Sequence, residues 1–277
     1  MLVSIVIPAC DAQDCIRAAL ASVLAQTYPD WEAIIVSDDG RDYLARLASQ
    51  GVADPRIRQV STGKVRSGCH RARNVGLESC SGAFVTQLDA DDEITPERLE
   101  RLLPLARERG AAADNLVLRD AGTAETLYRV LGDATAQVEL DIEGMMGLTS
   151  PVVPLVRRDC MTPRVEGVEL AEDVIANMQL IGRIGRLPVV PESSYVYNVA
   201  VGSICHQPGV AMRFDEAYAS YIDRLERGDG YGLPDALRPA AIRGLAAKRR
   251  LNLRYDDATE LGFVGTFQDF AAATRGD

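Results

Sequence analysis

The sequence has no hydrophobic run long enough to cross a membrane. A bilayer-spanning helix needs roughly 18 to 20 consecutive apolar residues, and no such stretch occurs in the 277 residues. The amino-terminal residues 2–8 lack the basic region and apolar core of a signal peptide, so they are expected to form a first strand. We therefore expect a soluble, cytoplasmic protein, with contact to the inner face of the membrane as an open alternative.

Paired cysteine spacing is also missing. The chain has six cysteines but no CxxC element, so neither a zinc site nor a disulfide framework is indicated. The two common glycine-rich phosphate cradles, GxGxxG and GxxxxGK[ST], are absent as well. The phosphates of any bound nucleotide must then be held by a metal ion and by side chains.

The chain has no basic stripe. Its formal net charge is −10, and its basic residues are dispersed along the sequence. Nucleic-acid binding needs clustered Lys and Arg to displace counterions from phosphates. This charge pattern excludes a nucleic-acid partner.

Strands and helices alternate through the first 120 residues. Apolar β-branched runs predict strands, and apolar residues at helical spacing predict the segments between them. The predicted strands are 3–7, 31–36, 56–60 and 83–88, and the predicted helices are 15–26, 42–50 and 68–78. This alternation predicts a parallel sheet with right-handed crossovers, whose ligands bind beyond the carboxyl ends of the strands.

The chain is organised around residues 83–92, an apolar strand that ends in Asp89, Asp91 and Asp92. Carboxylates crowded in this way are natural ligands of Mg²⁺ or Mn²⁺. They are also compatible with a solvated acidic turn before a helix that starts near residues 95–97, with Pro96 at its first position. These ten residues alone leave both interpretations open.

The second half is less regular. Residues 111–145 contain short apolar pieces that could extend the sheet, and residues 151–156 predict a buried strand. Edge strands are predicted at 187–190 and 194–199, and helices at 174–181, 211–227 and 234–257.

The last predicted helix carries a basic cluster, formed by Lys248, Arg249, Arg250 and Arg254. The cluster is either a solvated helix face or a patch for anionic lipid headgroups or a phosphorylated lipid-linked acceptor. The sequence leaves both readings open.

Five motifs, in order and at about the expected spacing, resemble those of family 2 glycosyltransferases. They are 4–8 (SIVIP), 22–28 (SVLAQTY), 34–40 (IIVSDDG), 72–76 (ARNVG) and 88–92 (LDADD). The resemblance implies an α/β protein of GT-A fold, with a Rossmann-like, mostly parallel sheet and a helical C-terminal extension. It implies a nucleotide-binding half at 1–110, an acceptor-side half at 111–209 and the extension at 210–277.

The same resemblance implies an inverting, metal-dependent transferase that uses a nucleotide-sugar donor and acts in polysaccharide or glycoconjugate biosynthesis. Its acceptor would be a carbohydrate or a lipid-linked hydroxyl. A metal-dependent nucleotidyltransferase and a non-catalytic nucleotide-sugar-binding relative are the alternatives. The sugar, the acceptor and the oligomeric state stay open.

Residues at the first two strand ends are implied to hold the nucleoside. By resemblance, Pro8, Ala9 and Asp11 contact it, and Asp38, or alternatively Asp39, accepts a hydrogen bond from the base. That carboxylate favours a UDP-sugar. Asp11 and the preceding cysteine stand where the family commonly has an asparagine and an aromatic residue, so the resemblance does not extend to base stacking there.

Further residues are implied to hold the diphosphate and its metal. Arg73 and Asn74 resemble the ARN element beside the nucleotide. Asp89 and Asp91, with Ala90 between them, resemble the DxD pair that binds the donor and Mn²⁺ or Mg²⁺, with Asp91 as a direct ligand.

The third metal ligand and the catalytic base are implied in the second half. His206 resembles a third ligand of the metal, although the basic residue that the family often has near Asn198 is absent. Asp173, in preference to Glu172, resembles the base at the start of a helix. A carboxylate pair that only stabilises the helix dipole is the simpler explanation for these two residues.

Overall fold

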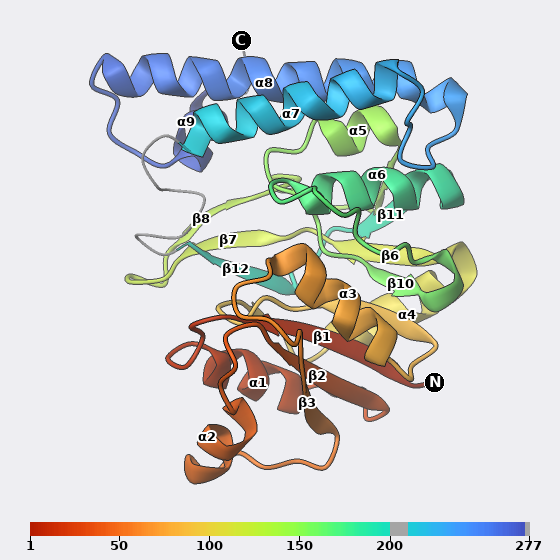
Figure 1. Ribbon diagram of the computed structural model, residues 1–277, viewed down its shortest axis with the longest axis vertical. Helices are drawn as coiled ribbons and strands as arrows, with labels where there is room; N and C mark the ends of the chain where they lie inside the picture. Colours follow the sequence, from red (N-terminus) through yellow and green to blue (C-terminus); the bar gives the residue numbers. More distant parts are fainter. Residues whose placement is uncertain (200–209, 275–277) are drawn as a thin grey trace.

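The computed structural model describes residues 1–199 and 210–274. Its centre is an eight-stranded sheet in the order β3-β2-β1-β4-β10-β6-β11-β9. The N-terminal strands form one end of this sheet, and the long C-terminal helices lie beyond the opposite end (Figure 1). The predicted α/β class with a helical C-terminal extension is confirmed.

Four parallel strands make the N-terminal part of the sheet. They are β1 (Val3–Ala9), β2 (Trp31–Ser37), β3 (Ile57–Ser61) and β4 (Phe84–Gln87). Because helices cover both faces of such a sheet, its central strands are mostly apolar. In β1, full burial is found for Val3, Ile5, Val6 and Ile7. The pairing of β1 with β2 and β4, and of β2 with β3, confirms the predicted parallel arrangement.

Four helices complete this half: α1 (Ile16–Leu24), α2 (Tyr43–Ser49), α3 (Cys69–Ser79) and α4 (Arg98–Arg109). Helix α3 lies close against the sheet, since a Cβ on Gly76 would meet Val6 Cγ1 at 2.2 Å. Helix α4 begins two residues after Pro96, so this proline precedes the helix and does not occupy its first position.

Beyond β4 the sheet is mixed. β10 (Leu155–Arg157) is antiparallel to β4 and to β6 (Ala111–Asp114). β11 (Leu187–Val190) lies between β6 and β9 (Val138–Leu140). The predicted edge position of 187–190 is therefore wrong, because β9, from the segment 111–145 that was predicted to extend the sheet, pairs with its outer side.

A four-stranded second sheet has the order β5-β12-β7-β8. Its strands are β5 (Glu93–Ile94), β12 (Tyr195–Val199), β7 (Val117–Asp120) and β8 (Thr126–Arg129). β12 is central, so its predicted edge position is also wrong. Asp114 anchors the start of β12: it accepts a hydrogen bond from the Ser194 N–H (3.0 Å) and pairs with Arg98 in a fully buried ion pair.

The remaining helices come after the first 110 residues. They are α5 (Ile142–Met146), α6 (Glu172–Ile184), α7 (Val210–Glu226), α8 (Arg238–Glu260) and α9 (Phe267–Ala273), with 3₁₀ turns at Arg158–Cys160 and Asp235–Leu237. α7 and α8 confirm the two predicted C-terminal helices, and α9 was not predicted. No helix within 1–199 or 210–274 is both long and apolar enough to span a bilayer.

Candidate active site

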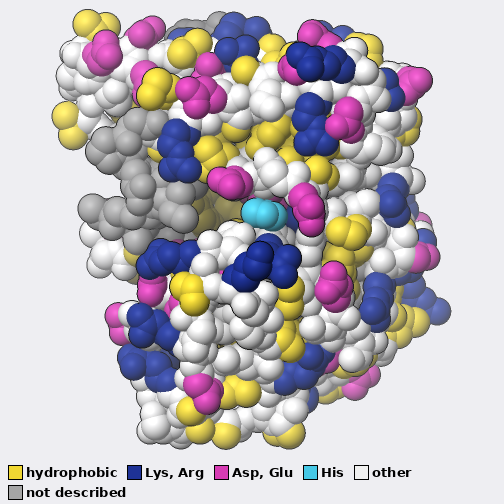
Figure 2. All heavy atoms as spheres, in the orientation of Figure 1, with side chains coloured by type: hydrophobic (Ala, Val, Ile, Leu, Met, Phe, Trp, Pro, Cys, Tyr) yellow, Lys and Arg dark blue, Asp and Glu magenta, His cyan; other side chains and the backbone are white. Residues whose placement is uncertain are grey.

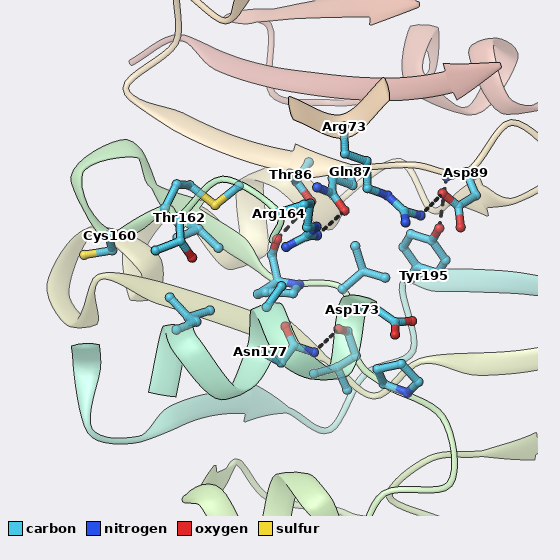
Figure 3. A pocket seen from close by; sticks show the side chains of 18 residues that line it. Arg73, Thr86, Gln87, Asp89, Cys160, Thr162, Arg164, Asp173, Asn177 and Tyr195 are labelled. Carbon is cyan, nitrogen blue, oxygen red and sulfur yellow. Dashed lines mark hydrogen bonds and ion pairs between the residues drawn. The ribbon is translucent and has the colours of Figure 1, made fainter. Parts of the chain in front are cut away.

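A pocket opens where the β4 carboxyl end faces the start of helix α6. Its lining includes Arg73, Asp89, Arg164, Asp173, Asn177 and Tyr195 (Figure 3). The face shown in Figure 2 is hollowed between the N-terminal part of the sheet and the helices above it, and charged side chains of both signs gather around the hollow. The structure thus brings Asp89 and Asp173 to one pocket from segments far apart in the sequence.

The turn after β4 is held by a buried tyrosine. The Tyr195 hydroxyl accepts a hydrogen bond from the Asp89 N–H (3.2 Å) and donates one to Asp92 Oδ2 (2.8 Å). The Asn198 N–H donates to the other Asp92 oxygen (2.9 Å). Burial raises the pKa of Asp92 well above its ordinary value. Asp92 therefore fastens β12 to the turn, and its two oxygens are already used by the protein.

Asp91 is in the opposite situation. The residue is exposed, and the hydrogen bond that its carboxylate accepts comes from its own backbone N–H. Desolvation raises the pKa of Asp91, and the neighbouring Asp89 raises it further. A carboxylate destabilised by crowding is suited to a divalent cation, which would relieve the repulsion.

The residues described contain no ready-made group of three His, Cys, Asp or Glu side chains that could hold a metal. Asp91 and Asp89 would then need the donor diphosphate to supply further oxygens, as Mg²⁺ sites commonly do. The predicted third ligand, His206, lies outside the described residues.

Arg73 joins the two sides of the pocket. Its guanidinium pairs with Asp89 (Nη2 to Oδ1, 2.6 Å) and with Glu172. Burial by itself would lower the pKa of Arg73. The attraction of the Asp89 carboxylate, together with smaller contributions, outweighs this effect and raises the pKa above its ordinary value. Arg73 is therefore a permanently charged bridge between the acidic turn and helix α6.

Glu172 and Asp173 differ sharply in their surroundings. Glu172 is buried between two arginines, with Arg164 Nε 2.6 Å from Oε2 and Arg73 on the other oxygen. Asp173 is half-buried and lines the pocket, where one of its oxygens accepts a hydrogen bond from the Val174 N–H (2.8 Å). Asp173 therefore faces the pocket, whereas both carboxylate oxygens of Glu172 are held in ion pairs.

Asn74 has a structural partner that the sequence did not indicate. Its amide donates to the Arg164 carbonyl (3.0 Å) and accepts from the Arg164 N–H (2.6 Å). The Arg164 side chain in turn donates to Gln87 (2.7 Å). Burial lowers the pKa of Arg164 to about 10. Asn74 thus fixes the segment that carries Arg164 into the pocket.

At the β2 end, the Asp38 carboxylate is enclosed by the loop of residues 62–68. Oδ1 accepts hydrogen bonds from the Thr62 hydroxyl (2.7 Å) and the Ser67 N–H (3.0 Å), and Oδ2 accepts one from the Gly68 N–H (3.0 Å). Burial opposes ionisation, yet these hydrogen bonds lower the pKa of Asp38. Asp38 is only 4% exposed, so it organises the loop and presents no free oxygen to a base.

Asp39 is saturated in the same way. It accepts hydrogen bonds from the Tyr43 hydroxyl (2.7 Å), the Asp11 N–H (2.8 Å) and the Arg41 N–H (3.0 Å). Despite burial, these donors lower the pKa of Asp39 to about 2. The Asp11 carboxylate pairs with Arg41 (3.2 Å) and with Arg66.

The remaining predicted contacts are backbone neighbours of these groups. Pro8 and Ala9 end β1 beside β2, and the Ala9 carbonyl accepts a hydrogen bond from the Asp38 N–H (2.8 Å). Ala90 is buried within the acidic turn. Backbone groups and the 62–68 loop therefore form the surface at the ends of β1 and β2.

Sequence reasoning missed Tyr195, Arg164 and the basic group beside Asn198. Arg119 Nε on β7 donates to Asn198 Oδ1 (2.9 Å), so a neighbouring strand supplies the cation that the sequence around Asn198 lacks. A tyrosine at the start of an apolar strand could have signalled Tyr195, because a buried hydroxyl needs a partner. No pattern in the neighbouring sequence indicates that Arg164 or Arg119 lies at the site.

The predicted basic cluster on α8 is divided between different contacts. Lys248 Nζ donates to the Leu148 carbonyl (2.6 Å), and Arg249 pairs with Asp215 of α7 (2.8 Å). Arg250 is exposed. Two of the four cations therefore serve internal contacts and do not add to a common surface patch.

Known proteins resemble this chain in sequence. The model of the family described as Glycosyl transferase family 2 matches residues 4–141. The succinoglycan biosynthesis protein ExoO of Rhizobium meliloti is 29% identical over 263 residues, which cover 89% of this chain and 71% of that protein. The UDP-Glc:alpha-D-GlcNAc-diphosphoundecaprenol beta-1,3-glucosyltransferase WfgD of Escherichia coli is 38% identical over 99 residues, which cover 36% of this chain and only 38% of that protein.

Solved structures resemble the fold. A crystal structure of residues 1–349 of Staphylococcus aureus TarS superposes with a TM-score of 0.67 at 17% identity, covering 90% of this chain and 71% of that one. The same TarS fragment in complex with UDP-GlcNAc gives a TM-score of 0.63 at 16% identity, covering 95% of this chain and 92% of that one. With the matched family model, the relatives and the shared fold, the chain belongs to glycosyl transferase family 2.

Proposed function

We propose that this protein transfers a sugar from a UDP-sugar to an acceptor hydroxyl with inversion at the anomeric carbon. The observation that carries the proposal is the placement of Asp89, from the turn after β4, and of Asp173, from the start of α6, on one pocket. The ExoO name and the TarS complex with UDP-GlcNAc support a role in polysaccharide or glycoconjugate biosynthesis with a uridine nucleotide donor. A nucleotidyltransferase finds no support in these relatives.

The two halves of the chain would bind different substrates. Residues 1–110 would bind the donor through the ends of β1, β2 and β4, and residues 111–199 would place a carbohydrate or lipid-linked acceptor near α6. Asp91 and Asp89 would hold Mn²⁺ or Mg²⁺ against the donor diphosphate. When bound, the ion would neutralise charge on the leaving diphosphate.

The protein's own groups would perform the remaining steps. Arg73, fixed between Asp89 and Glu172, keeps the acidic turn and helix α6 in register. Asp173 takes the proton of the acceptor hydroxyl as its oxygen attacks the anomeric carbon on the face opposite the diphosphate. Attack from that face inverts the configuration at this carbon.

The loop of residues 62–68 would take part in binding the base. Because this loop saturates Asp38, a direct hydrogen bond from Asp38 to uracil requires the loop to release one oxygen. We propose that Asp38 contributes to uracil binding by holding the loop and its backbone groups at the nucleoside site.

The adjacent acidic pair at the start of α6 gives a direct test. Asp173→Asn keeps the acceptor of the Val174 N–H but cannot take a proton, so turnover should fall at least roughly 100-fold while UDP affinity is retained. Initial rates with a panel of UDP- and GDP-sugars, and calorimetry with UDP, measure the two quantities.

Glu172→Gln is the matched control. It leaves Arg73 and Arg164 without their shared carboxylate, and breaking a buried ion pair costs about 3 kcal/mol or more of folding stability. Its defect should therefore appear in urea unfolding. Near-normal transfer by a folded Asp173→Asn variant would remove Asp173 as the base, and a wild-type protein that neither transfers nor hydrolyses any donor would refute the proposed activity.

A further inference from the structure

Arg98 is a fully buried cation next to the pocket. It is the first residue of α4, and its guanidinium pairs with Asp114 of β6 (Nε to Oδ2, 3.3 Å; Nη2 to Oδ1, 3.2 Å), with both side chains 0% exposed. Removing two charges from water is costly, and well-packed apolar side chains can often replace a buried ion pair without loss of stability. The pair is therefore a candidate for a role other than stability.

The guanidinium also contacts the wall of the pocket formed by residues 151–154. Nη2 donates to the Val153 carbonyl (2.5 Å), and Nη1 donates to the Thr86 hydroxyl (3.3 Å), which in turn donates to the Pro154 carbonyl (3.1 Å). These three residues line the pocket, and Thr86 is labelled in Figure 3. Arg98 thus fastens the 151–154 wall to β4, the strand that leads into the acidic turn.

A second set of contacts joins Arg98 to the acidic turn after β4. Asp114 accepts hydrogen bonds from the Ser194 N–H (3.0 Å) and from the Ser194 hydroxyl. The ring of the next residue, Tyr195, lies under the guanidinium, with Cζ 5.4 Å from the ring centroid, which is within cation–π range. The Tyr195 hydroxyl accepts a hydrogen bond from the Asp89 N–H (3.2 Å). One buried cation is therefore connected to the acidic turn through a single aromatic side chain.

The 151–154 wall is also tied to the helix that carries the proposed base. Asn177 of α6, one helical turn after Asp173, donates to a carbonyl of this wall (2.9 Å). Asp89 of the acidic turn and Asp173 line the same pocket. The relative position of these two carboxylates therefore depends on contacts that meet at Arg98.

We propose that Arg98 is a positioning residue that fixes the 151–154 wall and the acidic turn relative to each other. Because this role concerns the alignment of a bound donor with Asp173, it rests on the proposed function. Arg98 does not line the pocket and acts through Thr86, Tyr195 and the wall. Misalignment of bound reactants slows the chemical step without an equal loss of binding. Removal of the guanidinium therefore lowers kcat more than it raises the donor KM.

Hydrogen exchange tests the role without enzymatic activity. Arg98→Met alone leaves Asp114 charged and unpaired in the interior, which is strongly destabilising. The double variant Arg98→Met/Asp114→Asn removes both charges and keeps an amide oxygen for the Ser194 N–H. We expect its amide exchange to rise roughly tenfold or more in peptides that include 88–92 and in those that include 150–154, with β1 and β2 unchanged.

Arg98→Lys is the second variant, in case the double variant does not fold. It keeps the charge beside Asp114, but a compact ammonium cannot contact Thr86, the 151–154 wall and Tyr195 at once. Exchange should rise in both segments, by less than in the double variant. Wild-type protection of both segments in Arg98→Lys would overturn the role of Arg98.

Two further variants separate the two sets of contacts. Tyr195→Phe removes the hydroxyl that binds the acidic turn, so exchange should rise in 88–92 alone. Thr86→Val removes the hydroxyl that binds the wall, so exchange should rise in 150–154 alone. A change in only one segment of the Arg98→Met/Asp114→Asn variant would contradict a link between the two.

A second ion pair of α4 supplies the matched control. Arg109, at the other end of the helix, pairs with Glu139 of β9 (2.9 Å). Arg109→Met/Glu139→Gln should leave exchange in both segments, kcat and the donor KM at wild-type values. Arg98→Met/Asp114→Asn should lower kcat roughly 10-fold or more while changing the donor KM less than about threefold.

The outcomes separate the two proposals. An inactive wild-type protein in which Arg98→Met/Asp114→Asn loosens both segments refutes the transferase assignment but supports the positioning role. An active wild type in which this variant keeps kcat and local protection overturns the role of Arg98 and leaves the transferase assignment standing. Exchange raised throughout the protein, with a loss of kcat that follows thermal stability, would show a packing role only and also overturn it.

Discussion

The acidic groups at the ends of β2 and β4 look alike in sequence but differ in chemistry. At β2, Asp38 and Asp39 receive hydrogen bonds from several protein donors, and their pKa values are lowered. At β4, the Asp91 carboxylate accepts a hydrogen bond from its own backbone N–H, and its pKa is raised. The β2 carboxylates are therefore part of the architecture, whereas we propose that Asp91 binds a cation.

Asp92 shows that position alone does not decide between these roles. It is adjacent to Asp91, yet its two oxygens accept hydrogen bonds from Tyr195 and the Asn198 N–H. Ligand binding at a strand end thus depends on which carboxylates the surrounding protein has already satisfied.

Asp91→Asn should give the largest effect. Removing this carboxylate should weaken Mn²⁺-dependent UDP binding by about 100-fold or more, because a direct metal ligand is lost. Folding stability should be unchanged or slightly higher, since repulsion with Asp89 is relieved. Calorimetry with and without Mn²⁺ measures the first effect and urea unfolding the second. Glu97→Gln, an exposed change after the same turn, is the control, and unchanged Mn²⁺ dependence in Asp91→Asn would contradict the assignment.

Asp39→Asn should instead lower the free energy of unfolding. The pKa of Asp39 is lowered from 3.8 to about 2 in the folded protein, and nearly two pH units correspond to about 2 kcal/mol. A lowered pKa stabilises the fold above the unfolded value, so this contribution should be lost as the pH falls from about 4 to 2. Urea unfolding at several pH values measures it. The exposed Asp14→Asn variant should lose less than about 0.5 kcal/mol, and equal losses in both variants would count against the argument.

Asp38→Asn should have a smaller effect on nucleotide binding. Its amide would face the Gly68 N–H, so the 62–68 loop should loosen. We expect UDP affinity to fall roughly fivefold, equivalent to about 1 kcal/mol, with unchanged Mn²⁺ dependence. Calorimetry with UDP and GDP tests this. Tighter binding of GDP than UDP by the wild-type protein would reverse the proposed donor preference.

The smallest effect concerns acid titration of the wild-type protein. Because the pKa of Asp91 is raised, protons should compete with the metal at a pH where an ordinary aspartate stays ionised. Mn²⁺-dependent UDP affinity should decline by less than about tenfold for each pH unit in this range. Calorimetry over a descending pH series, with Asp91→Asn measured in parallel, follows the decline. The same pH profile in the wild type and in Asp91→Asn would place Asp91 with the satisfied carboxylates.

Sequence patterns predicted the N-terminal half well because its signals are local. β1 and β2 are mostly apolar runs followed by polar residues, and β4 begins with an apolar pair. Parallel pairing then brings the carboxyl ends of the three strands to one edge. The strands β11 and β12 show where this approach fails. Both were recognised as strands but misplaced as edges, because pairing with β9 and with β7 joins distant segments.

The sequence by itself determined the α/β alternation, the acidic strand ends and the carboxylate pair at the start of α6, since each depends on residues close together in the chain. Only the tertiary structure decided which carboxylates were free. Glu172 lies 99 residues from Arg73, and Asp92 lies 103 residues from Tyr195. The charge and hydrogen bonding of a buried carboxylate depend on groups within a few ångströms, and folding alone brings such distant groups that close.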